Sequence, residues 1–213
     1  MEQSTFKWII GSAPFLAAAV DEWRALAPEQ RVEAIEIVQN EVHEFDFTSI
    51  GKFENEHGKL QGTAFAAFGP QFMNFRRFEL MGALKERGLK LPPLISPGAQ
   101  VSLSASIGEN TWIGSGAVVA AGTTVGYNSY VGAGAIIGAH CTIGNSAWIE
   151  AGTIIGRNCK VGAFSQLGYG VILIDGIEVG KQCEIGKAGR YVRNIASKTF
   201  IHPDFDEEMV IVG

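Results

Sequence analysis

A six-residue periodicity through the second half of this 213-residue chain constrains its fold more than any other feature. Sixteen consecutive hexads, beginning at Ile95 and ending at Ile185, carry an aliphatic residue in phase. Glycine usually follows the aliphatic residue, and a small side chain lies four positions after it. The pattern is typical of a solenoid of short parallel strands, in which the aliphatic side chains of successive coils share one core. We expect the small residue at a tight corner and the glycine to let the backbone turn there.

The period resembles that of the hexapeptide-repeat family, whose fold is a left-handed parallel β-helix with three hexads in each coil. Sixteen hexads amount to about five coils. The resemblance covers residues 95–190, where 19 of the 27 glycines lie. We therefore predict three segments: a first domain over residues 1–93, the β-helix over 94–190, and a C-terminal tail over 191–213. The resemblance to the acyltransferase branch described below implies that the first is a substrate-binding domain and the second an acyl-CoA domain.

The first 94 residues carry a different pattern. Residues 7–11 and 63–68 are strand-like, whereas 15–26 and 72–87 have the spacing of helices, the second stopped by Gly88. Residues 28–42 fit a helix or a strand equally well. Strands that alternate with helices predict a small α/β, Rossmann-like domain with a parallel sheet.

The order of these segments resembles one branch of the repeat family, the sialic acid O-acetyltransferases and bacillosamine-pathway N-acetyltransferases. The resemblance is carried by residues 65–69 (FAAFG), the Arg76–Arg77 pair and residues 94–97 (LISP). It implies a nucleotide-linked sugar held by the front domain at Gly11, Ser12 and Gly69. It also implies acetyl-CoA as co-substrate, bound along the β-helix between two subunits of a homotrimer. The residues implied as acyl-CoA contacts are Trp148, Asn158 and Ala163.

The chain departs from this branch at its catalytic residues. Aligned on Cys141 and Gly144, Ala139 occupies the place of the family's catalytic histidine, and His140 that of an acidic residue. A second family histidine, near the acetyl group, falls on Trp148. The front loop, residues 11–15, has one glycine and a proline that lacks an N–H donor. Residues 198–213 replace the family's tail, which closes over CoA.

His140 is the candidate catalytic base, because acyl transfer needs a group to take a proton and imidazole does so near neutral pH. It follows Ile137 by three residues, a position expected to point outwards. The alternative is an ordinary surface histidine. Without a base, an unprotonated amine can attack a thioester directly, which favours N-acylation over O-acylation.

Two further sets of residues recur along the repeats. Trp112, Tyr130 and Trp148 are spaced by 18 residues and predict an exposed aromatic ladder, at a trimer interface or against the CoA or sugar. The three cysteines occupy small inward positions and are expected to serve packing. We expect no metal, because His140 is the only histidine within the repeats. The cysteines are Cys141, Cys159 and Cys183.

Composition narrows the remaining possibilities. The net charge is −5 and no basic cluster is present, which argues against nucleic acid. The sequence has neither an apolar run near the ~18 residues of a membrane span nor a signal-peptide pattern. We expect a cytoplasmic acyl-CoA-dependent acyltransferase acting on a sugar amine or hydroxyl. The alternatives are a non-catalytic trimeric scaffold and an acyltransferase with a non-sugar acceptor.

Overall fold

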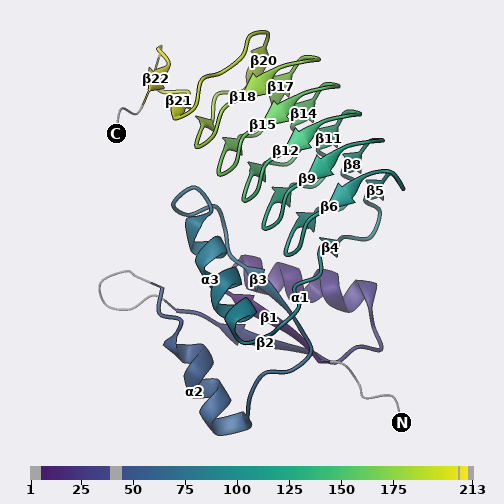
Figure 1. Cartoon of the computed structure of the whole chain (residues 1–213), viewed down its shortest axis with the longest axis vertical. Helices are drawn as coiled ribbons and strands as arrows, with labels where there is room; N and C mark the ends of the chain where they lie inside the picture. Colours follow the sequence, from purple (N-terminus) through teal and green to yellow (C-terminus); the bar gives the residue numbers. More distant parts are fainter. Residues whose placement is uncertain (1–5, 39–44, 206, 211–213) are drawn as a thin grey trace. The chain divides into compact units, whose positions relative to one another are not determined.

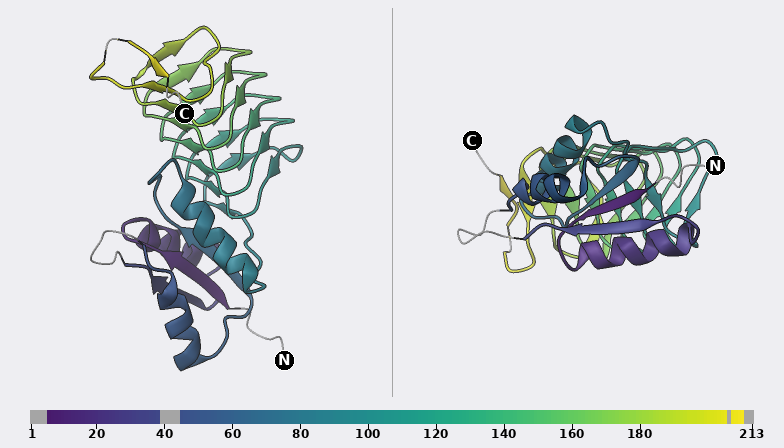
Figure 2. Two further views of the ribbon diagram at one scale, coloured as in Figure 1. Left: turned by 60° about the vertical axis from the view of Figure 1, so that its left-hand side comes forward. Right: turned by 90° about the horizontal axis from the view of Figure 1, so that it is seen from below.

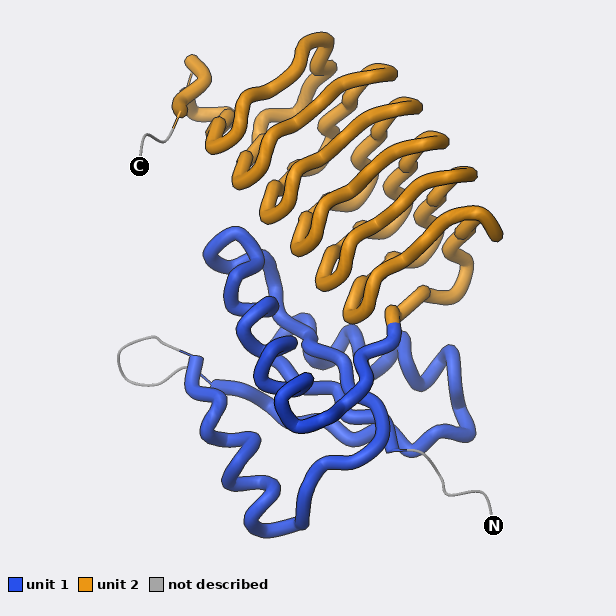
Figure 3. Tube along the Cα trace, viewed as in Figure 1, with its two compact units in different colours: residues 1–92 blue, residues 93–213 orange. Residues whose placement is uncertain are grey.

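The computed structural model describes residues 6–38, 45–205 and 207–210. The chain divides into two compact units, unit 1 over residues 1–92 and unit 2 over residues 93–213 (Figure 3). Among the described residues, the three-stranded sheet belongs to unit 1 and the other three sheets belong to unit 2.

Unit 1 is a three-stranded parallel sheet with the strand order β2-β1-β3 and three helices (Figure 1). The predicted parallel α/β unit is confirmed, and the ambiguous segment 28–42 forms a strand in its middle. Residues 39–42 of that segment lie outside the described residues. The elements are β1 (Lys7–Gly11), α1 (Phe15–Leu26), β2 (Val32–Glu36), α2 (Thr48–His57), β3 (Thr63–Ala67) and α3 (Phe75–Glu86).

The helices cover both faces of this sheet (Figure 2). Alternate residues of β1 point to opposite faces, so Lys7 meets Trp23 of α1 while Trp8 meets Phe53 of α2. Helix α2 was not predicted, because Ile50 is its only fully buried side chain and its sequence lacks an apolar stripe. Helix α3 begins three residues later than predicted, since residues 72–74 have positive φ angles.

Unit 2 is a parallel solenoid with three faces. Sheet 1 contains β4 (Leu94–Ile95), β7 (Trp112–Ile113), β10 (Tyr130–Val131), β13 (Trp148–Ile149), β16 (Gln166–Leu167), β19 (Glu184–Ile185), β21 (Thr199–Ile201) and β22 (Met209–Val210). Sheet 2 contains β5 (Gln100–Val101), β8 (Val118–Val119), β11 (Ile136–Ile137), β14 (Ile154–Ile155), β17 (Val171–Leu173) and β20 (Gly189–Tyr191). Sheet 3 contains β6 (Ser106–Ile107), β9 (Thr124–Val125), β12 (Thr142–Ile143), β15 (Lys160–Val161) and β18 (Glu178–Val179).

The hexad register is confirmed throughout the coils. The in-phase aliphatic residue is the inward member of each short strand, and Val131, Ile137 and Ile143 are at most 1% exposed. Strands pair in register with those of the next coil, as Ile137 does with Ile155. One contiguous core runs from Ile113 to Ile201.

The glycine that follows each aliphatic residue has a different role from the predicted one. The left-handed backbone conformation falls two residues later, for example at His140 and Asn158, both with φ 58°. A Cβ at Gly144 would instead lie 2.5 Å from the backbone nitrogen of Ala163 in the next coil. Glycine at this position therefore allows the coils to stack closely, although Ala120, Glu150 and Ile174 replace it elsewhere. The turn itself is made two positions later, by Gly, Asn or another residue with positive φ.

The solenoid extends beyond the predicted boundary at residue 190, to about six coils. Strand β20 keeps the 18-residue offset, with Leu173 paired to Tyr191. The last coil is two residues shorter, because Ile185 pairs with Ile201. This shortening moves the aliphatic residues out of phase, so the six-residue periodicity ends although the coiling continues.

The inward small residues confirm the prediction that the cysteines serve packing. Cys141, Cys159 and Cys183 are buried and unpaired, and burial raises the pKa of each thiol. The Cys141 thiol donates to the Gly156 carbonyl at 3.0 Å. Thr123, at the equivalent position one coil earlier, donates its hydroxyl to Gly138 at 2.7 Å. Cysteine and threonine thus satisfy the same corner carbonyl.

Candidate functional site

His140 lies at the corner between sheets 2 and 3, with its side chain exposed as predicted. The backbone N–H of His140 donates to the Ala121 carbonyl at 2.9 Å. A Cβ built on Gly122 would lie 2.5 Å from Nδ1 of the His140 ring. The ring therefore rests on the glycine of the preceding coil. Among the described residues no carboxylate forms an ion pair with it. Asn158 is exposed at the same corner, one coil further on.

The aromatic ladder exists, but the prediction that it is exposed is wrong. The ring centroids of Trp112 and Tyr130 are 5.6 Å apart, and those of Tyr130 and Trp148 are 4.1 Å apart. Trp112 is only 6% exposed and Trp148 only 2%. The rings cover one another, and the indole N–H of Trp112 is satisfied by Ser96 Oγ at 3.0 Å. The two tryptophans are thus buried and Tyr130 is half-buried, and Trp148 borders open space only at the small pocket that it lines.

Beside the last ring lies a small pocket of about 210 Å³, at the corner between sheets 1 and 2. The Trp148 indole N–H donates to Glu150 Oε1 at 2.8 Å. The nearby charge of Glu150 raises the pKa of the Tyr169 hydroxyl. Trp148, Glu150 and Tyr169 therefore lie together in the pocket wall. Sequence analysis left Glu150 and Tyr169 without a function.

A larger groove of about 1130 Å³ runs along sheet 3 and its corner with sheet 1. Ala163 lines it, and its backbone N–H has no acceptor within the part of the chain that the structure describes. Two equivalent N–H groups in other coils are capped by side chains: that of Tyr127, two coils earlier, donates to Asn145 Oδ1, and that of Lys181, one coil later, donates to Ser197 Oγ. The Ala163 donor is therefore available to a ligand in the groove.

The structure does not bring the predicted site residues of unit 2 together within one chain. His140 and Asn158 share the corner between sheets 2 and 3, Ala163 lies in the groove, and Trp148 lies on sheet 1. A single site that used all of them would need residues from more than one copy.

The predicted substrate residues of unit 1 do lie together, at the carboxyl end of the sheet. Gly11 ends β1, the Ser12 N–H donates to the Ala67 carbonyl at 3.2 Å, and Gly69 follows β3. The strand order places them at the point where successive connections leave in opposite directions, the usual ligand position in such sheets. Protein atoms already fill part of this space, because a Cβ at Gly69 would lie 2.5 Å from the ring of Phe15.

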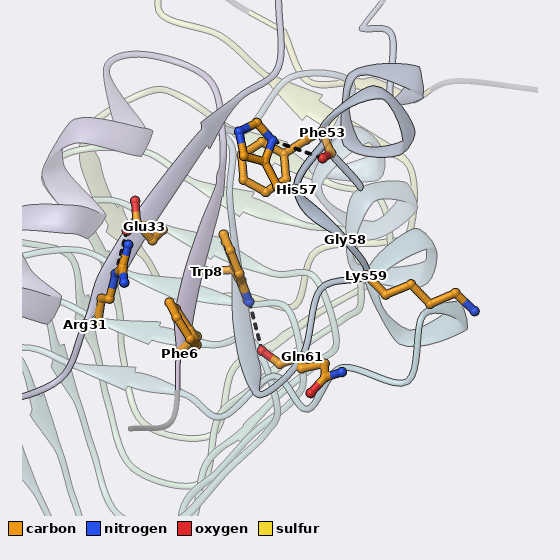
Figure 4. A pocket seen from close by; sticks show the side chains of 9 residues that line it. All are labelled: Phe6, Trp8, Arg31, Glu33, Phe53, His57, Gly58, Lys59 and Gln61. Carbon is orange, nitrogen blue, oxygen red and sulfur yellow. Dashed lines mark hydrogen bonds and ion pairs between the residues drawn. The ribbon is translucent and has the colours of Figure 1, made fainter. Parts of the chain in front are cut away.

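A separate cavity of about 440 Å³ opens at the opposite, amino end of the same sheet (Figure 4). Phe6 stacks on Trp8 with centroids 5.7 Å apart, and Phe53 stacks on His57 at 4.4 Å. Arg31 lies over the Phe6 ring and pairs with Glu33 at 2.8 Å. Sequence analysis missed this cavity, because its aromatic residues come from segments far apart in the chain.

The described residues contain neither a cluster of metal ligands nor a membrane-spanning helix. Within residues 6–38, 45–205 and 207–210, no three His, Cys, Asp or Glu side chains converge to hold a metal ion. None of the helices in those ranges is long and apolar enough to cross a membrane.

Two known families have models that match part of the solenoid. Residues 104–139 match the bacterial transferase hexapeptide family (six repeats), and residues 135–163 match the hexapeptide repeat of succinyl-transferase. Residues 104–163 are therefore similar to the hexapeptide repeats of bacterial transferases. The resemblance inferred from the six-residue period is thereby confirmed for this segment. No curated protein matches the chain.

Solved structures share the fold of the hexapeptide-repeat chain over nearly its whole length. PerB from Caulobacter crescentus, solved with CoA and GDP-perosamine, has a TM-score of 0.80 and 21% identity, covering 93% of this chain and 94% of PerB. The acetyltransferase domain of PglB from Neisseria gonorrhoeae has a TM-score of 0.78 and 24% identity, covering 93% of this chain and 97% of that domain. The same domain was also solved with acetyl coenzyme A. These likenesses establish the shared fold.

Proposed function

We propose that the chain is an acyl-CoA-dependent acyltransferase that transfers an acetyl group to an amine of a nucleotide-linked sugar. The observation that carries the proposal is the joint arrangement of a small α/β unit and a hexapeptide-repeat solenoid. PerB has the same arrangement over 93% of this chain and was solved with CoA and GDP-perosamine. A cytoplasmic location fits three cysteines that remain unpaired.

The co-substrate is assigned to the groove on sheet 3. Its volume of about 1130 Å³ suits a long, extended ligand. The open N–H of Ala163 is a donor for an amide or thioester carbonyl, and Lys181 in the groove wall supplies positive charge for CoA phosphates. The sugar nucleotide is assigned to the carboxyl end of the sheet in unit 1, at Gly11, Ser12 and Gly69.

The reaction follows from the chemistry of a thioester. The nitrogen lone pair of the acceptor attacks the carbonyl carbon, a C–N bond forms, and the C–S bond breaks. His140 is assigned to take the proton from nitrogen and return it to the leaving thiolate, which departs as free CoA thiol. The second route, direct attack by an unprotonated amine, needs no base from the chain.

Replacing His140 with alanine is expected to lower kcat by about 10²- to 10⁴-fold, the usual loss for a general base. The exposed ring supports no core packing, so the melting temperature should not change. Acetyl-CoA turnover as a function of pH provides the measurement, and His202→Ala is a matched control. A variant that keeps its rate within about threefold, with a pH profile that follows the acceptor amine, would remove His140 from catalysis.

A homotrimer is part of the proposal, and sheet 2 provides its interface. Its outward column is an aliphatic stripe of Val118, Ile136, Ile154 and Ile172, with the three isoleucines 37–44% exposed. Exposed apolar columns of this kind mark interaction surfaces. Sheet 2 is bounded by the corner of His140 and the corner of Glu150, so a neighbouring copy on the stripe lies beside both.

Ile136→Asp is expected to convert the trimer to monomers, because it places a charge in the centre of the stripe without touching the core. Light scattering should change from about three times the 22.8 kDa chain mass to about that mass itself. Ser106→Asp, on the exposed face of sheet 3, is the matched control. A wild-type protein of 22.8 kDa would contradict the trimer outright.

A thermal-shift screen tests the function itself. Acetyl-CoA and nucleotide-linked amino sugars are each expected to raise the melting temperature, since both bind the folded state. Stabilisation by acetyl-CoA without any nucleotide sugar would instead indicate a non-sugar acceptor. Stabilisation by neither would indicate a non-catalytic scaffold.

A further inference from the structure

Glu150 occupies a position that glycine holds in most coils. The equivalent residues of the adjacent coils are Gly132 and Gly168, because this point lies close to the next coil. A Cβ at Gly132 would lie 2.5 Å from the Ala151 nitrogen. A long charged side chain at such a position is accommodated only where the local structure makes room for it.

The Glu150 side chain is held by one donor, the Trp148 indole N–H, which reaches Oε1 at 2.8 Å. Tyr169 lines the same pocket, and the nearby charge of Glu150 raises the pKa of its hydroxyl. An indole N–H can only donate a hydrogen bond. Because Trp148 is only 2% exposed, packing fixes the direction in which its N–H points. The carboxylate is thereby oriented in the wall of the 210 Å³ pocket rather than free in solvent.

The pocket has the character of a site for a small cation. Glu150 and Glu184 both line it, and no Lys or Arg is among the described residues that do so. Trp148 and Tyr169 add aromatic rings, which attract cations. A volume of about 210 Å³ admits an ammonium group and the few carbons around it, but not a whole nucleotide.

We propose that Glu150, oriented by Trp148, binds the primary ammonium group of the acceptor and selects amines over hydroxyls. This inference rests on the proposed acyltransferase function, whose acceptor it assigns to a defined subsite. An alcohol of the same shape offers no charge to Glu150 and leaves the carboxylate of a negative pocket without its partner. Glu150 is an acceptor-binding residue. His140 of the same chain lies at another corner of the coil, so a His140 that takes the proton from this amine would belong to a neighbouring copy in the proposed trimer.

Steady-state kinetics of Glu150→Gln provide the test, with GDP-perosamine as the amine acceptor and the same nucleotide sugar bearing a hydroxyl as its counterpart. The KM for the amine is expected to rise by about 10- to 100-fold, the worth of a hydrogen bond to a charged group. The KM for acetyl-CoA should not change. The difference from wild type should shrink above the pKa of the acceptor amine, where the charge is lost.

Two further variants separate binding from structure. Tyr169→Phe keeps the carboxylate and removes only a hydroxyl from the pocket lining, so its KM for the amine should rise less than that of Glu150→Gln. Glu109→Gln, an exposed glutamate elsewhere on the solenoid, should match wild type. An unchanged KM for the amine in Glu150→Gln, or an equal loss with amine and hydroxyl acceptors, overturns the proposal.

A wild-type protein that acetylates no amine would refute the proposed function but would still leave Glu150 testable. Glucosamine and glucose, compared at equal concentration by thermal shift, then decide the question. A rise in melting temperature with glucosamine alone, absent in Glu150→Gln, supports the ammonium site. An equal response to both sugars, or none, overturns it.

Discussion

Ile137→Asp is expected to abolish folding of the solenoid. Ile137 is fully buried, pairs with Val119 and Ile155 in the adjacent coils, and belongs to the continuous core of unit 2. Burying an unpaired carboxylate there costs several kcal/mol, on top of about 2–5 kcal/mol for the lost aliphatic packing. Domains have about 5–15 kcal/mol of stability in total. We expect insoluble or unfolded protein, measured by circular dichroism and solubility after expression.

The adjacent residue provides the control for this prediction. Ile136 lies on the same strand, but its side chain points to the opposite face and is 44% exposed. Ile136→Asp should therefore fold, with only its assembly changed. A soluble Ile137→Asp protein with an unchanged melting temperature would mean that the assigned inward and outward faces are reversed.

The solenoid could be predicted in detail because every coil repeats the same local rule. An error at one hexad is corrected by the next, and strand pairing between coils follows from the constant 18-residue offset. The last coil was missed because shortening by two residues removes the period without removing the coil. Helix α2 was missed for a related reason: it carries no periodic apolar pattern of its own.

The role of individual side chains at the corners was harder to predict. Sequence spacing gave the stacking of Trp112, Tyr130 and Trp148 but not their burial, which depends on what covers the rings in three dimensions. The recurrent glycine suggested that the backbone turns at that residue. In the structure, a side chain there would instead collide with the backbone of the next coil. That second reading would have identified Glu150 from the sequence, as the one long charged side chain in a column of glycines and small residues.

The site residues of the two units also differ in how far sequence could place them. Gly11, Ser12 and Gly69 come together because parallel strands end at the same edge of a sheet. The groove that contains Ala163 is built from four strands of sheet 3, the corners that follow them and residues 194–197, and no short motif encodes it. The aromatic cavity beside Trp8 likewise joins residues from β1, β2 and α2, which only the fold brings together.

Unit 1 buries the amino group of a lysine, Lys7, in surroundings that disfavour its charged form. Lys7 is fully buried, donates to the Ala64 carbonyl at 3.2 Å and lies 3.5 Å above the Trp23 ring. Burial lowers the pKa of Lys7 from its ordinary 10.5 to about 7. Between these values the unfolded chain binds a proton that the folded chain does not, so the stability of unit 1 rises with pH. Below about pH 7 the folded state carries the full penalty of a buried charge.

Lys7→Met is therefore expected to stabilise unit 1, most strongly in acid. The gain at pH 6 should be about 3–5 kcal/mol, reduced by loss of the carbonyl hydrogen bond and the cation–π contact. At pH 9.5 the gain should be about 3 kcal/mol smaller, because the folded wild type then holds a neutral amine. Urea unfolding of both proteins at the two pH values measures the difference and cancels the titration of all other groups. A Lys7→Met protein less stable than wild type at pH 6, or a gain independent of pH, would show that Lys7 keeps its charge in the folded protein through Trp23 and Ala64.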